Sequence, residues 1–262
     1  MNLKGRFPFR LGTTSYIIPD DILPNVRYLA SRVDDIELVL FESDEISNIP
    51  DAATVRTLKS LADDHGLTYT VHLPMDTWLG HADEGVRRES VGKCLRIVRR
   101  MGALDPFAYV VHFHGDRRGP IPTDDLPRWL ENHRRSMNEL CAEANGVPLC
   151  VETLEYPFEL IEGLCLEEGW PLCLDVGHML LTGQSVEGYL SRRLERTGVV
   201  HLHGIRDGRD HQDLRGLDPA LLAALLANLS AGRDRVVTLE IFGEEDLRQS
   251  IEVLRRFLPC PQ

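Results

Sequence analysis

Histidine and carboxylate side chains recur where the apolar segments of this sequence end. In Cys173–His178, Asp175 and His178 lie three residues apart at the end of one apolar run. Five other runs end in the same residue types, namely His72, His112 with His114, Glu152, His201 with His203, and Glu240. Imidazole and carboxylate groups are ligands for divalent cations. Their recurrence predicts one metal site assembled from several strands, and favours an enzyme over a binding module.

The segments that must position these residues alternate between short apolar runs and longer amphipathic ones. Because the apolar runs are continuous, they are typical of parallel strands covered by helices. We predict strands at Arg10–Ser15, Ile36–Phe41, Leu67–Leu73, Phe107–Phe113, Pro148–Thr153, Leu172–Val176, Val199–Leu202 and Arg235–Ile241. We predict helices at Asp20–Ser31, Pro50–His65, Asp83–Met101, Thr123–Asn145, Glu159–Glu168, Ser185–Arg196, Asp218–Leu229 and Glu244–Leu258.

Eight strand–helix units within 262 residues predict an α/β protein with a single-domain (β/α)₈ TIM barrel over residues 1–262. The alternative is an open, doubly wound sheet, which places its site at one switch point. Ligand-type residues at six of the eight strand ends favour the closed ring. No linker divides the sequence.

The composition of the chain indicates which kinds of molecule it is expected to bind. The net charge is −12, so the chain lacks the basic surface expected of a nucleic-acid-binding protein. No apolar run approaches the ~20 residues of a membrane span, and Met1–Arg10 is followed by no apolar signal segment. We therefore expect a cytoplasmic protein that acts on a small molecule, with neither nucleic acid nor membrane as a partner.

The residues at the last four strand ends form the first expected metal site, with three carboxylates and one imidazole from Glu152, Asp175, His201 and Glu240. This donor set suits a divalent ion, with Zn²⁺ expected first and Mn²⁺ or Fe²⁺ also compatible. A second group, His72, His112, His178 and His211, has the composition to bind further ions, giving one to three in all. Glu37 lies between apolar residues in a predicted strand and needs a partner if it is buried, so it could orient a ligand.

Residues that could bind substrate lie in the segments after the strands, on the catalytic face of a barrel. Arginine suits phosphate oxygens, although loop arginines are often simply solvated. The expected substrate-binding residues are Thr13, Thr14, Ser15, Tyr16, Trp78, His114, Arg117, His203, Arg206 and Arg209. The segments that carry most of them are Pro74–Ala82, Gly115–Pro122 and Gly204–Gly216.

Five motifs resemble the xylose-isomerase-like barrels, which include sugar isomerases, sugar epimerases and an AP-endonuclease branch. The motifs are Val-Val-His (110–112), Leu-Cys-Val-Glu-Thr (149–153), Cys-Leu-Asp-Val-Gly-His (173–178), His-Leu-His-Gly (201–204) and Thr-Leu-Glu-Ile-Phe (238–242). The resemblance implies metal binding by Glu152, Asp175, His201 and Glu240. In the endonuclease branch further histidines bind zinc, and an Asp stands two residues before the last of them. That position is Arg209 here, with Asp210 next to it.

The segments Leu11–Val26 and Asp35–Glu42 resemble the cobamide-remodelling phosphodiesterases. This resemblance implies a hydrolase that opens the nucleotide loop of a cobamide, a corrinoid, to give cobinamide phosphate and α-ribazole for salvage. A cation-bound hydroxide would be the nucleophile, with Glu152, Glu240 and His178 as catalytic residues. The alternative is a sugar isomerase or epimerase on the same barrel, with Glu152 and Glu240 as its acid–base pair. AP-endonuclease-like DNA repair and a non-catalytic ligand carrier are further alternatives.

Overall fold

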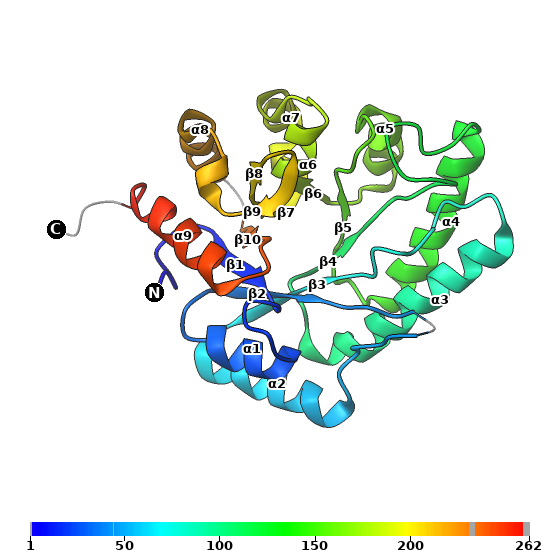
Figure 1. Ribbon diagram of the computed structural model, residues 1–262. Coiled ribbons are helices and arrows are strands. Elements are labelled where there is room, and N and C mark those ends of the chain that lie inside the picture. Colours follow the sequence, from blue (N-terminus) through cyan, green and yellow to red (C-terminus); the bar gives the residue numbers. More distant parts are fainter. Residues whose placement is uncertain (1, 44, 231–233, 259–262) are drawn as a thin grey trace.

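A closed eight-stranded barrel forms the centre of the computed structural model, which describes residues 2–43, 45–230 and 234–258 (Figure 1). All its strand pairs are parallel, in the ring order β1-β10-β7-β6-β5-β4-β3-β2. The strands are β1 (Arg10–Thr14), β2 (Asp35–Val39), β3 (Thr68–His72), β4 (Ala108–Val111), β5 (Leu149–Glu152), β6 (Leu172–Asp175), β7 (Thr197–Leu202) and β10 (Val236–Leu239). The prediction of a (β/α)₈ barrel is confirmed.

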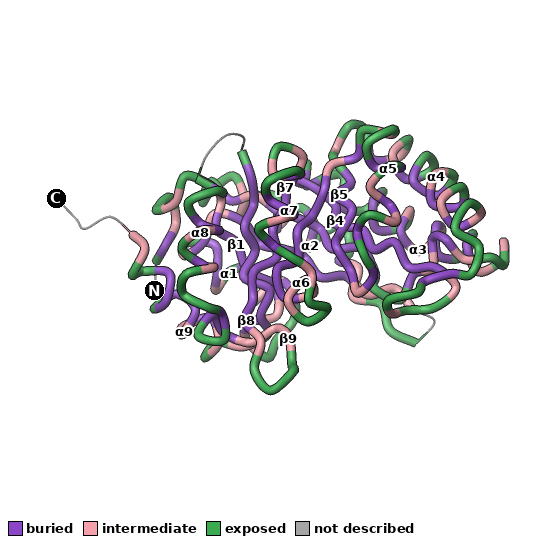
Figure 2. The backbone as a smooth tube through the Cα atoms, turned by 90° about the horizontal axis from the view of Figure 1, so that it is seen from above, coloured by how far each residue is buried: buried purple, intermediate pink, exposed green. Residues whose placement is uncertain are grey.

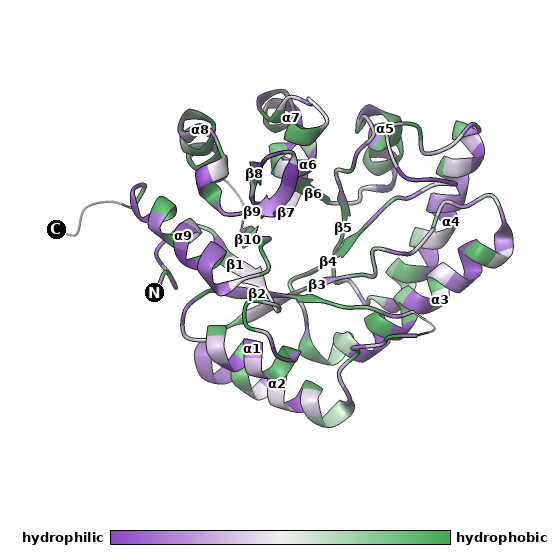
Figure 3. Cartoon of the chain, viewed as in Figure 1, coloured by the Kyte–Doolittle hydropathy of each residue, from purple (hydrophilic) through white to green (hydrophobic). Residues whose placement is uncertain are grey.

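Helices surround the ring of strands, as Figure 1 shows. They are α1 (Ile22–Leu29), α2 (Ala52–His65), α3 (Glu84–Met101), α4 (Leu126–Glu143), α5 (Glu159–Glu168), α6 (Val176–Leu181), α7 (Val186–Arg193), α8 (Pro219–Leu229) and α9 (Glu244–Arg255), with short 3₁₀ turns η1 (Gly102–Leu104), η2 (Leu194–Arg196) and η3 (Leu214–Gly216). Hydrophilic and hydrophobic residues lie side by side along most of these helices (Figure 3). Among the described residues, no helix is both long and apolar enough to cross a membrane.

Helix boundaries follow local capping chemistry. Gly66 ends α2 with a φ of +58°, a left-handed conformation that glycine adopts without strain. Ser185 caps α7 by accepting a hydrogen bond from the Gly188 N–H. For α4, predicted as Thr123–Asn145, the cap is Asp125, because its carboxylate accepts from the Arg128 N–H. The predicted helix therefore starts two to three residues too early.

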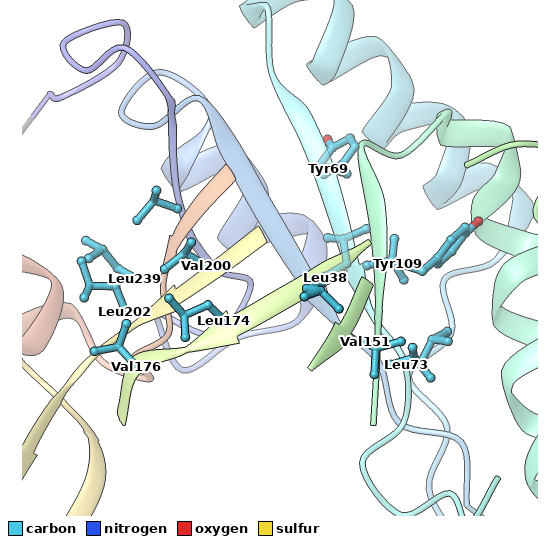
Figure 4. Packing of buried hydrophobic residues seen from close by; sticks show 14 of the residues in the cluster. Leu38, Tyr69, Leu73, Tyr109, Val151, Leu174, Val176, Val200, Leu202 and Leu239 are labelled. Atoms are coloured by element: carbon cyan, nitrogen blue, oxygen red, sulfur yellow. The ribbon is translucent and has the colours of Figure 1, made fainter. Parts of the chain in front are cut away.

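The strands separate two apolar layers because successive side chains point to opposite faces. Outward residues such as Leu174, Val200 and Leu239 belong to the large cluster beneath the helices (Figure 4). A smaller separate cluster contains Ala108, Val110, Cys150, Cys173 and Val199. Its members alternate with the outward residues, and all but Ala108 lie two positions before His112, Glu152, Asp175 or His201 along their strands. The inner cluster therefore forms an apolar floor below the polar strand ends.

An added two-stranded hairpin stands above the barrel between β7 and α8. Strands β8 (Gly204–Arg206) and β9 (Arg209–Gln212) pair antiparallel. Asp207 and Gly208 form the turn with φ values of 52° and 73°, as in the Asp-Gly hairpin turn. Figure 2 shows the hairpin tip exposed and projecting from the buried strands. The segment Gly204–Gly216, for which no strand was predicted, therefore contains a hairpin.

Asp35 in β2 is a buried carboxyl group whose raised pKa should make the stability of the fold depend on pH. It is fully buried, and burial raises its pKa from 3.8 to about 6 despite hydrogen bonds from Thr68 and Thr70. Well below pH 3.8 the carboxyl is protonated in both folded and unfolded chains. Between pH 3.8 and 6 the unfolded chain loses this proton while the folded chain keeps it, so the free energy of unfolding falls by about 3 kcal/mol over that range and levels off above pH 6.

The Asp35→Asn variant lacks this titration, so its stability relative to the wild type should rise by about 2 kcal/mol between pH 4 and pH 8, with most of the rise complete by pH 6. Urea unfolding of both proteins across that range measures the difference in their free energies of unfolding. The contributions of titratable groups that both proteins share cancel in this difference. A difference that does not change with pH would contradict the assignment of a raised pKa to Asp35.

Candidate metal centre

Four ligand-type side chains meet above the inner apolar floor. Glu152 and Asp175 are the last residues of β5 and β6, His201 lies in β7, and Glu240 follows β10. All four are buried, and one ligand atom from each lies within 4.8 Å of the others. The Nδ1 atom of His201 is 3.2 Å from Glu240 Oε2, 3.4 Å from Glu152 Oε1 and 3.8 Å from Asp175 Oδ2. The closed ring therefore brings together the four residues that the sequence groups as the first metal site.

The contacts within this group fit a bound cation. Both His201 Nδ1 and Glu240 Oε2 are buried and make no hydrogen bond with any described residue. Because the other ring nitrogen of His201 faces Glu37, a neutral His201 directs the Nδ1 lone pair at the Glu240 carboxylate. Two lone pairs facing each other across 3.2 Å need a positive charge between them, which a proton on His201 or a bound divalent cation supplies. Three carboxylates and one imidazole supply the donors that such a cation needs.

Electrostatics within the group favour the same conclusion. Burial alone would raise the pKa of Glu152, but His112 and His201 hold it well below its ordinary value. Burial likewise opposes ionisation of Glu240, and His201 with His211 lowers the pKa of that carboxyl well below its usual range. The pKa of His201 is lowered by burial but raised well above its ordinary value by Cys173 and the surrounding carboxylates. The centre thus keeps its carboxylates ionised and draws in positive charge.

The second group of histidines surrounds the carboxylates of the first. His112 Nε2 lies 2.9 Å from Glu152 Oε2, and His72 Nε2 lies 3.4 Å from the same oxygen. The Nδ1–H of His72 donates to the Leu73 carbonyl. Burial would lower the pKa of His72, but Glu152 and Glu37 raise it to about 9. Both histidines can therefore donate hydrogen bonds to Glu152, and His72, Glu152 and His201 also form a three-residue group of metal-binding geometry.

His178 and His211 lie on the other side of the centre. His178 Nδ1 is 3.6 Å from both Glu152 Oε1 and Asp175 Oδ2. His211, at a φ of 51°, places its Nδ1 3.7 Å from Glu240 Oε2. His178 and His211 form a ligand-like group with Asp210, not with Arg209, which is exposed. The acidic residue beside these two histidines is therefore Asp210.

His203 connects the centre to the hairpin. It is fully buried, its Nε2 lies 3.2 Å from Asp175 Oδ2, and its Nδ1 accepts the His211 N–H. Accepting at Nδ1 leaves the proton on Nε2, which donates to Asp175. A Cβ atom on Gly177 would lie 1.9 Å from His203 Cε1, so only glycine fits there. His203, expected to bind substrate, is placed where it orients Asp175 and holds β9.

The hydroxyl groups after β1 are engaged within the barrel. Thr13 and Thr14 donate to the carbonyls of Leu239 and Ile241, and all three residues from Thr13 to Ser15 are fully buried. Ser15 Oγ accepts the Val39 N–H. These bonds join β1 to both of its neighbours, so the structure places the three hydroxyls in strand contacts rather than at the mouth of the barrel.

The expected arginines already have acidic partners or stand in solvent. Arg117 pairs with Asp124, and Arg206 pairs with the fully buried Asp213. Arg209 is exposed at the start of β9. The structure does not gather these side chains over the four-residue centre, as the phosphate-binding expectation requires.

Aromatic side chains lie around the centre. Tyr16 lines a cavity of about 670 Å³ together with Phe41 and Phe242. The Phe242 ring is 5.2 Å from that of His211 and is 47% exposed, so this cavity borders the centre. Trp78 lies 5.6 Å from His114. Burial lowers the pKa of His114 to about 2, and its Nε2 is 3.3 Å from His112 Nδ1.

Phe41 and Phe242 were missed by the sequence analysis. Their only sequence signal is their position directly after predicted strand ends.

Comparisons with known proteins agree with this architecture. Residues 30–257 match the family model for the xylose isomerase-like TIM barrel. A D-tagatose 3-epimerase-like protein superimposes with a TM-score of 0.72 at 18% identity, covering 95% of this chain and 97% of the other. D-psicose 3-epimerase from Clostridium cellulolyticum H10 gives a TM-score of 0.70 at 19% identity, covering 95% and 99%. The IOLI protein, solved with a bound zinc atom, gives 0.73 at 14% identity, covering 95% and 97%.

The search among curated proteins gave no match. The prediction of a hydrolase is wrong on these comparisons, because the structural neighbours whose names state an activity are epimerases, which are isomerases. These matches also give no support to the cobamide phosphodiesterase family. With the family model matching 30–257 of 262 residues, the chain belongs to the xylose isomerase-like TIM barrel family.

Proposed function

We propose that this protein is a divalent-metal-dependent isomerase that epimerises a ketose at the carbon next to its carbonyl group. The observation that carries the proposal is the buried group of Glu152, Asp175, His201 and Glu240, in which two ionised glutamates accompany a cation site. The epimerases among the structural neighbours support the same reaction class, although at 16–19% identity their likeness concerns the fold.

Glu152 and Glu240 are the acid–base pair in this proposal. They come from β5 and from the end of β10, which are separated in the ring by β6 and β7. The two carboxylates therefore approach the centre from different strands, as inversion at one carbon requires. One carboxylate removes the proton from carbon, and the other, once it has taken a proton from solvent, delivers it to the opposite face. The first carboxylate then releases its proton to solvent, so each turnover replaces the substrate proton with a solvent proton. Because the pKa values of Glu152 and Glu240 are held low, both are ionised in the resting centre and either can act as the base.

The cation would be held by Glu152, Asp175, His201 and Glu240. When bound, it polarises the ketose carbonyl, which makes the neighbouring C–H acidic. Zn²⁺, Mn²⁺ and Fe²⁺ are all compatible with these donors. We assign one ion to this group, with His112 and His203 acting as hydrogen-bond partners of Glu152 and Asp175 rather than as ligands of further ions.

Aromatic residues would complete the substrate site. Tyr16, Phe41 and Phe242 line the cavity beside the centre, and their rings suit the apolar C–H faces of a sugar. The Tyr16 hydroxyl accepts a hydrogen bond from Asn48, which fixes the ring in place. In this proposal the aromatic residues hold the sugar and exclude water while the two glutamates exchange protons.

Solvent-isotope exchange tests the proposal directly. We expect the protein, supplied with Mn²⁺, Co²⁺ or Zn²⁺ in D₂O, to incorporate one deuterium at the epimerised carbon of at least one ketose from a panel of ketohexoses and ketopentoses. Proton NMR detects both the new epimer and the lost C–H signal. Failure to exchange with every ketose and every cation, by a protein shown to bind the cation, would refute the proposed reaction.

A further inference from the structure

Glu37 contacts the candidate metal centre from a strand that is not adjacent to β7 in the ring. It lies in β2, whereas His201 lies in β7, and β1 and β10 separate these strands in the ring. Glu37 Oε2 is 2.9 Å from His201 Nε2, and both side chains are fully buried. The contact therefore crosses the barrel interior and joins a residue outside the four-residue group to its one imidazole.

This contact determines which ring nitrogen can bind a cation. An ionised carboxylate only accepts hydrogen bonds, so the nitrogen that faces Glu37 must carry the proton. With the proton on Nε2, the lone pair of His201 lies on Nδ1. That atom faces Glu240, Glu152 and Asp175 at 3.2, 3.4 and 3.8 Å and has no hydrogen bond of its own among the described residues.

Burial of Glu37 is costly unless it serves the centre. Its second oxygen, Oε1, has no hydrogen-bond partner in the described part of the chain. A buried carboxylate with one partner is a poor structural element, since an apolar residue of similar size often stabilises a core better. A cation near His201 offsets this cost through the polarised imidazole, because a carboxylate behind a metal-binding histidine raises the basicity of the ligand.

We infer that Glu37 is the positioning residue of the metal centre: it holds His201 with its proton on Nε2, so that Nδ1 is the ligand atom. The inference rests on the proposed metal site but not on any particular substrate.

Nitrogen NMR tests the assignment in the wild-type protein, so the result does not depend on a variant that folds. Zinc alone is added to ¹⁵N-labelled protein, and long-range proton–nitrogen spectra distinguish metal-bound, protonated and bare ring nitrogens. The His201 signals are identified by their loss in His201→Asn. We expect a zinc-bound Nδ1 and a protonated Nε2. Zinc on Nε2, or no zinc on His201, would overturn the inference.

Zinc affinity provides a second measurement. Glu37→Leu removes the acceptor and should weaken zinc binding by about 10- to 100-fold. Glu37→Gln keeps an oxygen that can accept from Nε2–H, so it should lose less affinity than Glu37→Leu. Asp35→Asn is the matched control, because Asp35 is equally buried in the same strand but bonds Thr68 and Thr70. It should bind zinc within about twofold of the wild type.

The outcomes separate a positioning role from a structural one. A folded Glu37→Leu variant with wild-type zinc affinity, or an equal loss in Asp35→Asn, would show that Glu37 is merely structural. If Glu37→Leu does not fold, the NMR assignment and the Glu37→Gln affinity decide the question. Zinc bound through Nδ1 without deuterium exchange on any ketose would leave this inference standing and refute the proposed function. Deuterium exchange by a protein that binds zinc through Nε2 would support the proposed function and overturn this inference.

Discussion

Replacing Glu240 with glutamine is expected to slow epimerisation by about 10²- to 10⁴-fold, the range for loss of a general acid–base group. Glutamine has nearly the same shape, but it cannot take a proton and it removes one negative charge from the cation site. Glu240 Oε2 makes no hydrogen bond with a described residue, so the substitution breaks none at that atom. The measurement is kcat/KM for the ketose found by isotope exchange, with circular dichroism to confirm the fold.

The matched control is Glu245→Gln, five residues further along the chain. Glu245 is exposed in the first turn of α9 and pairs with Arg248, away from the centre. Its replacement should leave kcat/KM within about twofold of the wild-type value, since an exposed ion pair of this kind contributes little to the stability of the fold. Wild-type turnover by Glu240→Gln would remove Glu240 from the acid–base pair and from the proposed mechanism.

The barrel and its central ligands could be predicted from the sequence because both depend on local patterns. Continuous apolar runs mark parallel strands, and the polar residue that ends each run lies at the carboxyl edge of the ring. Glu152, Asp175, His201 and Glu240 are brought together by strand order alone. No knowledge of side-chain packing is needed to group them.

Contacts between distant segments could not be predicted in the same way. Asp175 and His178 lie three residues apart at the end of one predicted strand, and their spacing does not show how they are placed relative to each other. In the structure α6 begins immediately after β6, and the Asp175 carboxylate caps it by accepting the His178 N–H at 2.6 Å. Gly177 is needed because His203 packs against it, a contact across 26 residues that no local pattern reveals. The Asp207–Gly208 turn, by contrast, carried a readable hairpin signal that was overlooked.

The role of the extra histidines could not be decided from the sequence. The sequence groups His72, His112 and His178 as possible ligands for further ions, and His72 lies in a group of metal-binding geometry with Glu152 and His201. In the structure His112 and His72 direct Nε2 at Glu152 Oε2, the oxygen opposite the one that faces His201. A hydrogen-bond donor and a metal ligand are the same residue type, so composition and spacing cannot distinguish them. The difference lies in ring orientation, which depends on packing.

Removal of divalent cations should abolish turnover and lower the melting temperature by roughly 10 °C. A ligand at about 1,000 times its Kd stabilises the folded state by about 4 kcal/mol, and each kcal/mol is worth about 2–4 °C for a chain of this size. The physical reason is the crowding of the Glu152, Asp175 and Glu240 carboxylates around His201 Nδ1. Differential scanning fluorimetry with chelator, and then with zinc restored, measures the shift.

Two variants show whether this shift originates in the four-residue centre. Asp175→Asn removes one ligand charge while an amide oxygen can still cap α6, so its melting temperature should respond little to zinc. Glu245→Gln should keep the full zinc-dependent rise. An unchanged rise in Asp175→Asn would place the stabilising cation elsewhere, because a site that loses one of three carboxylates must bind a divalent cation more weakly. Partial protection of Asp175→Asn at much higher zinc concentration would instead fit a weakened site, since the stabilisation depends on the ratio of free zinc to Kd.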